Sequence, residues 1–128
     1  MIKPILVDTD VMVDYLRGHP KAVTLVKNGA EGIGISSIVI AELYAGMRGE
    51  QEQAVLDALF SAFRVISVTG PIARVGGLFK RDFGKSHGVG LPDAIVAATV
   101  QIENAELCTL NVKHYPMFKG LKPAYAKP

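Results

Sequence analysis

Three acidic residues in separate segments are the side chains of this sequence best suited to act together in chemistry. Asp8 ends an apolar run in ILVDTD, Glu42 interrupts the apolar segment IVIAELYAG, and Asp93 follows a proline in GLPDAIVAA. Two carboxylates about 4 Å apart repel by roughly 4 kcal/mol at an effective dielectric near 20, so converging acids must share protons, pair with bases or bind a cation. Because the same segments contain no His or Cys, the set favours Mg²⁺ or Mn²⁺ over zinc.

Each of these acids also has a purely structural explanation. Asp8 leaves a strand where open α/β sheets bind their ligands, whereas Asp10 is expected to cap the following helix. Glu42 could instead pair with a base or lie on a partly exposed seam. Asp93 could merely complement the dipole at a helix start. We expect a functional site because the glycine-rich, basic segment 84–90 before Asp93 has the character of a loop beside an active site.

Alternating strands and helices must bring these acids together. Strands are expected at 5–7, 32–36, 64–68 and 106–109, with helices at 11–16, from 20 toward 29, around Glu42, at 50–63, from 70 to about 83, and from Asp93 onward. The tail 119–128 is expected to add a short edge strand. This order predicts an α/β fold with three layers, in which a central, mostly parallel sheet carries helices on both faces. Since no linker or repeat interrupts the chain, residues 1–128 are expected to form a single domain.

The acidic motifs, in this order, resemble those of the PIN-domain nucleases, and more narrowly of the VapC-type toxin ribonucleases of bacterial and archaeal toxin–antitoxin pairs. The resemblance rests on VDTDVMVDYLRG, SSIVIAELYAGM and GLPDAIVAATVQIENAELCTLNVKHYPMF, and it runs nearly end to end. It implies a PIN-like domain and a Mg²⁺-dependent or Mn²⁺-dependent endoribonuclease that hydrolyses RNA by a metal-activated water. The implied catalytic and metal-binding residues are Asp8, Glu42 and Asp93, supported by Thr9 and Asp10.

Asn111 stands where many members of that family carry a fourth acid. An amide supplies no charge, so the number of metal ions, one or two, stays open. Its carbonyl oxygen and NH₂ group can still orient the neighbouring ligands, and we expect that role for it. The alternative is an ordinary turn residue.

The resemblance also implies two protein partners, namely a cognate antitoxin that occludes the site and a second copy of the chain in a homodimer. Apolar residues on more than one face of the helices 20–27 and 50–63 agree with protein partners. No segment is apolar enough to span a membrane, and because the start MIKPILVDTD leads directly into an expected strand, we expect no signal peptide. A single cysteine, Cys108, excludes an internal disulfide, so we expect a core residue and a cytoplasmic location.

Basic residues are expected to attract the RNA. The formal net charge is only +2, but setting aside the three site acids and Asp10 leaves eight acidic residues against fourteen Lys and Arg. Such a surface attracts phosphates. The best-placed bases are Lys80, Arg81, Lys85 and Lys113, and for each the alternative is a solvated helix face.

Two other functions remain open. The first motif also resembles that of haloacid-dehalogenase-type phosphatases, in which Asp8 would be a covalent nucleophile and Asp10 a general acid. That family needs a later pair of neighbouring metal-binding acids, whereas Asp93 stands alone. A catalytically silent RNA-binding or interaction domain of the same fold is the second alternative. Against it, only a metal site readily explains Glu42, and nuclease assays with and without Mg²⁺ would separate the two.

Overall fold

The computed structural model describes residues 3–29 and 32–127, so Pro128 of the expected tail strand lies outside the described residues. In this part of the chain, four short parallel strands form one sheet in the order β3-β2-β1-β4. The strands are β1 (Ile5–Val7), β2 (Ile33–Ser36), β3 (Arg64–Ile66) and β4 (Glu106–Cys108). Because all four run in the same direction, their carboxyl ends meet at one edge of the sheet.

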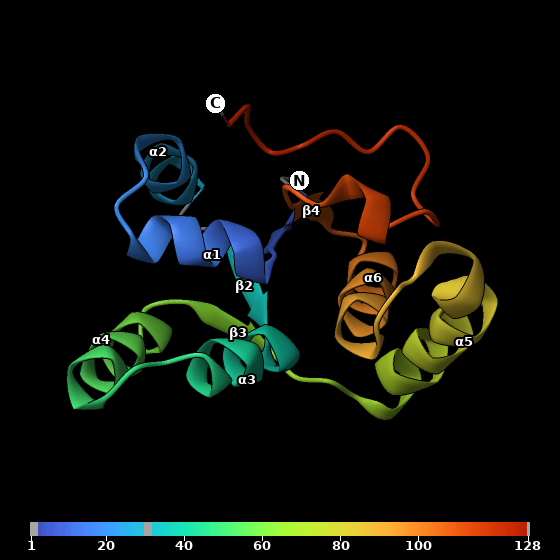
Figure 1. The fold of residues 1–128 in the computed structure, drawn as a ribbon, viewed down its shortest axis with the longest axis horizontal. Coiled ribbons are helices and arrows are strands. Elements are labelled where there is room, and N and C mark those ends of the chain that lie inside the picture. Colours follow the sequence, from blue (N-terminus) through green and yellow to red (C-terminus); the bar gives the residue numbers. More distant parts are fainter. Residues whose placement is uncertain (1–2, 30–31, 128) are drawn as a thin grey trace.

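Helices cover both faces of this sheet. They are α1 (Thr9–Leu16), α2 (Pro20–Asn28), α3 (Ser37–Ala45), α4 (Glu50–Phe60), α5 (Gly70–His87) and α6 (Leu91–Glu103), followed by the 3₁₀ turn η1 (Val112–His114). In Figure 1, α6 lies on one side of the sheet with α5 packed outside it, and α1, α2, α3 and α4 lie on the other side. The expected three-layer α/β fold is confirmed. Among the described residues, no helix has the length and apolar character needed to cross a bilayer.

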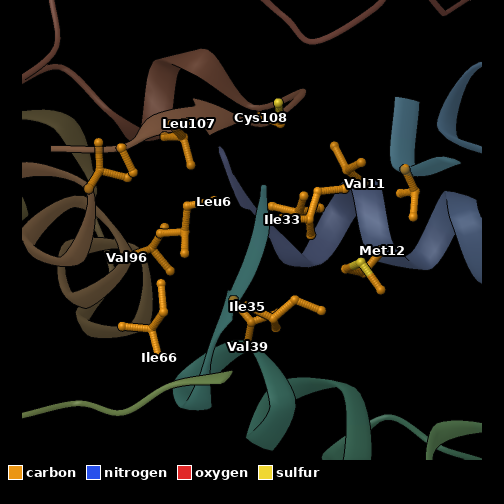
Figure 2. Close-up of a cluster of buried hydrophobic side chains, with 14 of the residues drawn as sticks. Leu6, Val11, Met12, Ile33, Ile35, Val39, Ile66, Val96, Leu107 and Cys108 are labelled. Carbon is orange, nitrogen blue, oxygen red and sulfur yellow. The ribbon is translucent and has the colours of Figure 1, made fainter. Parts of the chain in front are cut away.

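The hydrophobic core lies on both faces of the sheet, as Figure 2 shows. Leu6 of β1 meets Val96 of α6 on one face, and Ile35 of β2 meets Val39 of α3 and Met12 of α1 on the other. All five side chains are fully buried. This packing holds the start of α1, the body of α3 and the start of α6 around the carboxyl edge of the sheet, where the acidic residues lie.

The start of α1 differs from the sequence-based expectation. The helix begins at Thr9, and its N-cap is Asp8, whose carboxylate accepts a hydrogen bond of 2.8 Å from the Thr9 N–H. The expectation that Asp10 caps this helix was therefore wrong. Because β1 ends at Val7, the last extended residue before the helix is Asp8 (φ −81°, ψ 165°), and Asp10 already lies in the first turn.

Helix α5 is longer than expected, and it includes residues 84–87 of the segment 84–90 that was predicted to be a loop. It continues through Gly84 to His87, and only residues 88–90 connect it to α6. The helix ends at Gly88, which adopts a left-handed conformation (φ 65°) that costs glycine little. The approach to Asp93 is thus a short connection.

The tail was expected to add an edge strand, and that expectation was wrong for residues 119–127, which form no strand. One backbone bond of 2.9 Å, from Ala124 N–H to the Thr109 carbonyl, links the tail to the end of β4. Beyond it, Tyr125 and Lys127 turn toward Asp14 of α1. The tail thus crosses to α1 and α2 rather than pairing along β4, as its path in Figure 1 shows.

Candidate active site

Three elements place the three predicted acids at the carboxyl edge of the sheet. Asp8 follows β1, Glu42 lies in the second half of α3, and Asp93 lies in the first turn of α6. Two hydroxyl groups link them. The Tyr115 Oη atom lies 2.6 Å from Asp8 Oδ2 and 3.4 Å from Asp93 Oδ1. The Thr9 hydroxyl, next to Asp8, donates a hydrogen bond of 2.8 Å to Glu42 Oε1.

The acids influence one another electrostatically. Burial raises the pKa of Glu42, and the charges of Asp93 and Asp8 raise it further, against the hydrogen bond from Thr9. The pKa of Asp93 is raised first by burial and then by the charge of Asp8. Like charges destabilise the ionised form of a neighbour when they are close and poorly solvated. The three carboxylates therefore form one cluster of negative charge.

Asp8 is the best-enclosed member of this cluster, with 5% of its surface exposed. Its Oδ1 atom accepts the bond from the Thr9 N–H, and its Oδ2 atom accepts bonds from the hydroxyls of Thr109 (2.9 Å) and Tyr115 (2.6 Å). All of these donors are neutral. They satisfy the hydrogen-bonding needs of the carboxylate without cancelling its charge.

Asp10 joins two segments of the chain beside the acids. Its Oδ2 atom accepts backbone hydrogen bonds from Leu110 (2.9 Å) and Asn111 (3.1 Å), and its Oδ1 atom accepts one from Val11 (2.8 Å). Burial, followed by the charge of Asp8, raises its pKa against these bonds. The bonds tie the first turn of α1 to the segment after β4.

Asn111 reaches the site through its backbone. Its N–H group contacts Asp10 Oδ2, whereas its side chain is exposed and makes no hydrogen bond to other described residues. The orienting role expected for the amide remains a prediction.

One base lies beside the acids. His114 Nδ1 is 3.0 Å from Asp93 Oδ2, and this imidazole is about half exposed. Within residues 3–29 and 32–127, no Lys or Arg forms a salt bridge with Asp8, Glu42 or Asp93. The salt bridge weighed for Glu42 is therefore not formed in the described part of the chain.

The donor set suits a hard divalent cation. Its candidate ligands are carboxylate oxygens, the kind that Mg²⁺ and Mn²⁺ prefer. In the described part of the chain, no group of three His, Cys, Asp or Glu side chains stands close enough together to hold a metal ion. Asp8, Glu42 and Asp93 suit such a cation because their donors are carboxylate oxygens and because no Lys or Arg of the described residues pairs with them.

The four predicted RNA-binding bases lie in different surroundings. Lys80 donates a bond of 2.9 Å to the Val89 carbonyl, and Arg81 bonds to its neighbour Asp82 at 2.9 Å. Lys85 and Lys113 are exposed and form no hydrogen bond or salt bridge to other described residues. Lys113 precedes His114, whose imidazole contacts Asp93.

A groove of about 680 Å³ opens from the site. It begins at Thr9 and Glu42 and runs between α1 on one side and α3 and α4 on the other. Its lining is about equally apolar and polar. The apolar side chains are Val13, Leu16, Leu43, Met47, Val55 and Leu56, and the polar ones beyond Thr9 and Glu42 are Arg17, Arg48, Gln51 and Glu52. The groove is continuous with the candidate ligands and large enough to hold a peptide segment.

Sequence reasoning missed two residues of the site, Thr109 and Tyr115. Both are essentially fully buried and both donate hydrogen bonds to Asp8. They lie about a hundred positions from Asp8 in the chain, so no local pattern connects them. The one available signal was Tyr115 itself, because a tyrosine hydroxyl needs a hydrogen-bond partner when its ring is buried.

Comparisons with known proteins identify relatives of this chain. The PIN domain family matches residues 5–115. Ribonuclease VapC19 from Mycobacterium tuberculosis is 45% identical over 124 residues, which cover 94% of this chain and 98% of the relative. Ribonuclease VapC10 from the same organism is 42% identical over 129 residues, covering 97% and 95% of the two chains.

Solved structures with a similar fold include components of two-protein complexes. A chain of a toxin–antitoxin complex from Klebsiella pneumoniae superposes with a TM-score of 0.80 at 26% identity, covering 94% of this chain and 98% of that one. A chain of VapBC2 from Rickettsia felis, bound to a DNA fragment from the promoter, gives a TM-score of 0.74 at 27% identity, with 91% and 94% covered.

Proposed function

The chain belongs to the PIN domain family, and from this premise we propose that it is a metal-dependent endoribonuclease, the toxin of a toxin–antitoxin pair. The relatives named as VapC ribonucleases cover almost the whole chain, which supports the activity as well as the fold. One observation carries the site assignment. Asp8, Glu42 and Asp93 come from three elements and are bridged by the hydroxyls of Tyr115 and Thr9, and burial followed by like charge raises the pKa values of Glu42 and Asp93.

In this proposal, the carboxylates of Asp8, Glu42 and Asp93 hold the ion, which is Mg²⁺ or Mn²⁺. A divalent cation bound there lowers the pKa of water and stabilises the charge that develops on a phosphate during hydrolysis. The Thr9 hydroxyl holds Glu42 toward Asp8. The carboxylate of Asp10 keeps the segment after β4 against α1, so the donors to Asp8 stay in place.

RNA is proposed to approach from the side of the tail. Residues 107–127 contain no acid, and this stretch carries the exposed lysines Lys113, Lys119 and Lys122. The segment begins at the site itself, because Thr109 and Tyr115 contact Asp8. Exposed positive charge attracts a polyanion and raises its local concentration.

The groove that opens at Glu42 is proposed to receive the antitoxin. Its six apolar side chains, set among polar ones, suit a protein segment better than an RNA strand. A partner seated there would cover Thr9 and Glu42 and so block access to the ion. The toxin–antitoxin structures among the similar folds support a partner of this kind. We also propose a homodimer, supported by the exposed apolar side chains Leu91 and Ile102 on α6.

Family membership favours this function over the phosphatase alternative. In a phosphatase, Asp10 would need to exchange a proton with the substrate, whereas here its carboxylate accepts three backbone hydrogen bonds. The silent RNA-binding alternative is separated from the nuclease by experiment.

The test uses the purified protein and a mixed-sequence, single-stranded RNA. We expect cleavage with Mg²⁺ or Mn²⁺, no cleavage in EDTA, and recovery when excess Mg²⁺ is added back. Full activity in EDTA would contradict a metal-dependent nuclease. RNA that is bound but left intact at every Mg²⁺ concentration would support the silent domain.

A further inference from the structure

Tyr115 occupies an unusual place beside the acids. It directly follows η1, is 1% exposed and is among the largest fully buried side chains in the described part of the chain. Its ring stacks on Phe118, with ring centroids 6.4 Å apart, so the position of the ring is fixed by packing. The ring aims its hydroxyl into the space between Asp8 and Asp93.

The hydroxyl makes one strong contact and one long contact. At 2.6 Å from Asp8 Oδ2, it donates a short, charge-assisted hydrogen bond. At 3.4 Å from Asp93 Oδ1, it lies beyond the usual range for a hydroxyl-to-oxygen bond. A phenol has a single proton to donate, so the bond belongs to Asp8. Asp93 is held at a longer distance from the same oxygen.

Three donors together fix the orientation of the Asp8 carboxylate. The Thr9 N–H holds Oδ1, while Thr109 and Tyr115 hold Oδ2. Rotation about the last side-chain bond of Asp8 would break at least one of these bonds. A metal ligand whose orientation is preset loses less entropy when the ion binds, which is how residues around the ligands raise metal affinity.

A second tyrosine shows what a merely structural contact looks like in this chain. Tyr125 Oη lies 2.7 Å from Oδ2 of the buried Asp14, and Lys127 Nζ lies 2.8 Å from Oδ1 of the same residue. That carboxylate has a cationic partner within the protein. Asp8 has a tyrosine in the same relation and only neutral donors.

We propose that Tyr115 is a positioning residue for the cation site, which fixes the Asp8 carboxylate toward Asp93 by donating its hydroxyl proton to Asp8. This inference rests on the proposed function, because it takes Asp8 and Asp93 as ligands of one ion. It adds a residue that neither the acidic motifs nor the family assignment identifies.

The test compares Tyr115→Phe with Tyr125→Phe, since each removes one hydroxyl from a buried aspartate and leaves the ring. Mn²⁺ binding to the protein is measured by isothermal titration calorimetry without RNA. We expect Tyr115→Phe to bind Mn²⁺ about 10- to 100-fold more weakly than the wild type, the usual loss for a residue that orients a ligand. Tyr125→Phe should bind Mn²⁺ like the wild type, although it unfolds at a lower temperature.

A second readout separates positioning from chemistry. The RNA cleavage rate of Tyr115→Phe should reach half its maximum at an Mn²⁺ concentration at least about tenfold higher than in the wild type, and should recover at saturating Mn²⁺. A rate that stays low at saturation would overturn the proposal. Unchanged Mn²⁺ affinity in Tyr115→Phe would overturn it too, as would a variant that fails to fold. If instead the wild type neither binds Mn²⁺ nor cleaves RNA, the proposed function itself fails.

Discussion

Two buried aspartates, six positions apart, have opposite electrostatic surroundings. Asp8 and Asp14 are each 5% exposed, and each accepts a short hydrogen bond from a tyrosine hydroxyl. Asp14 also binds the ammonium of Lys127, so its charge is cancelled inside the protein. Asp8 receives only neutral donors and lies near Asp10, Glu42 and Asp93, whose pKa values are all raised.

Asp14 has a cationic partner within the protein, whereas Asp8 has none among the described residues. Burial alone would raise the pKa of Asp14, but hydrogen bonds from Lys127 and Tyr125 outweigh it and lower the pKa. Asp8 accepts hydrogen bonds only from neutral groups, and no Lys or Arg of the described residues forms a salt bridge with it. A buried carboxylate without a cationic partner inside the protein marks a place where a cation from outside can be bound.

The largest expected effect comes from removing charge at the site. Asp8→Asn, Glu42→Gln and Asp93→Asn should each abolish RNA cleavage, because each removes a proposed ligand of the ion. Asp14→Asn changes the aspartate that is paired with Lys127 and is the matched control. It should keep cleaving RNA at a rate near that of the wild type. Gel assays of RNA cleavage at saturating Mg²⁺ check both. Equal losses in the site variants and in Asp14→Asn would contradict the distinction between the two aspartates.

The second-largest effect is expected on the stability of the protein, when Asp14 loses its cationic partner. Lys127→Met leaves Asp14 without its cationic partner and should lower the free energy of unfolding at pH 7 by about 1.5–3 kcal/mol, typical of hydrogen bonds to charged groups. Lys122→Met, at an exposed lysine, is the control and should change little.

This loss should depend on pH in a defined direction. The pKa of Asp14 is lowered in the folded state, so its contribution is fully present above the ordinary aspartate pKa of about 3.9 and is lost as the pH falls through the folded pKa. Urea denaturation at pH 7 and at pH 3 should therefore show a smaller difference between wild type and Lys127→Met at pH 3. A difference that grew on acidification would exclude this origin.

The basic residues also fall into two groups, those engaged by other residues and those that are exposed. Lys80 and Arg81 are engaged by Val89 and Asp82, whereas Lys113, Lys119 and Lys122 are exposed in a stretch without acids. In an Asp8→Asn background that binds RNA without cutting it, charge reversal of those three lysines should weaken binding of single-stranded RNA. It should also reduce the salt slope by about 0.7 for each phosphate that the protein no longer neutralises. Reversal of Lys80 and Arg81 should do less, as measured by fluorescence anisotropy. A larger effect there would place the RNA along α5.

The smallest effect is expected at Asn111. If its amide orients the ligands, Asn111→Ala should reduce cleavage at limiting Mg²⁺ by about tenfold, the lower end for such residues. Asn111→Asp should retain activity and bind the metal more tightly. Cleavage by Asn111→Ala at the wild-type rate would mean that this residue acts only through the N–H group that it donates to Asp10.

The acids were predictable because each depends on local sequence. A strand end, an interrupted apolar helix and a Pro-Asp helix start are visible within a few residues, and so is the alternation that predicts the sheet. The assignment of the cap failed because Asp8 and Asp10 have equal preference for that position. Only the end of β1 at Val7 decides between them.

The other residues of the candidate site and the path of the tail could not be predicted, because they depend on contacts between distant segments. Thr109 and Tyr115 become part of the site only when β4 pairs with β1 and brings the following turn beside Asp8. The tail was expected to add a short edge strand, whereas Tyr125 and Lys127 bind Asp14, more than a hundred residues earlier. No periodic pattern carries that information.

The most direct test of the central claim is the binding of Mn²⁺ to the metal-free wild type, Asp8→Asn and Asp14→Asn, measured by isothermal titration calorimetry without RNA. An uncancelled charge at Asp8 and a cancelled one at Asp14 predict that the wild type binds Mn²⁺, that Asp8→Asn loses this binding, and that Asp14→Asn keeps it. Mn²⁺ binding of wild-type strength in Asp8→Asn would contradict the account.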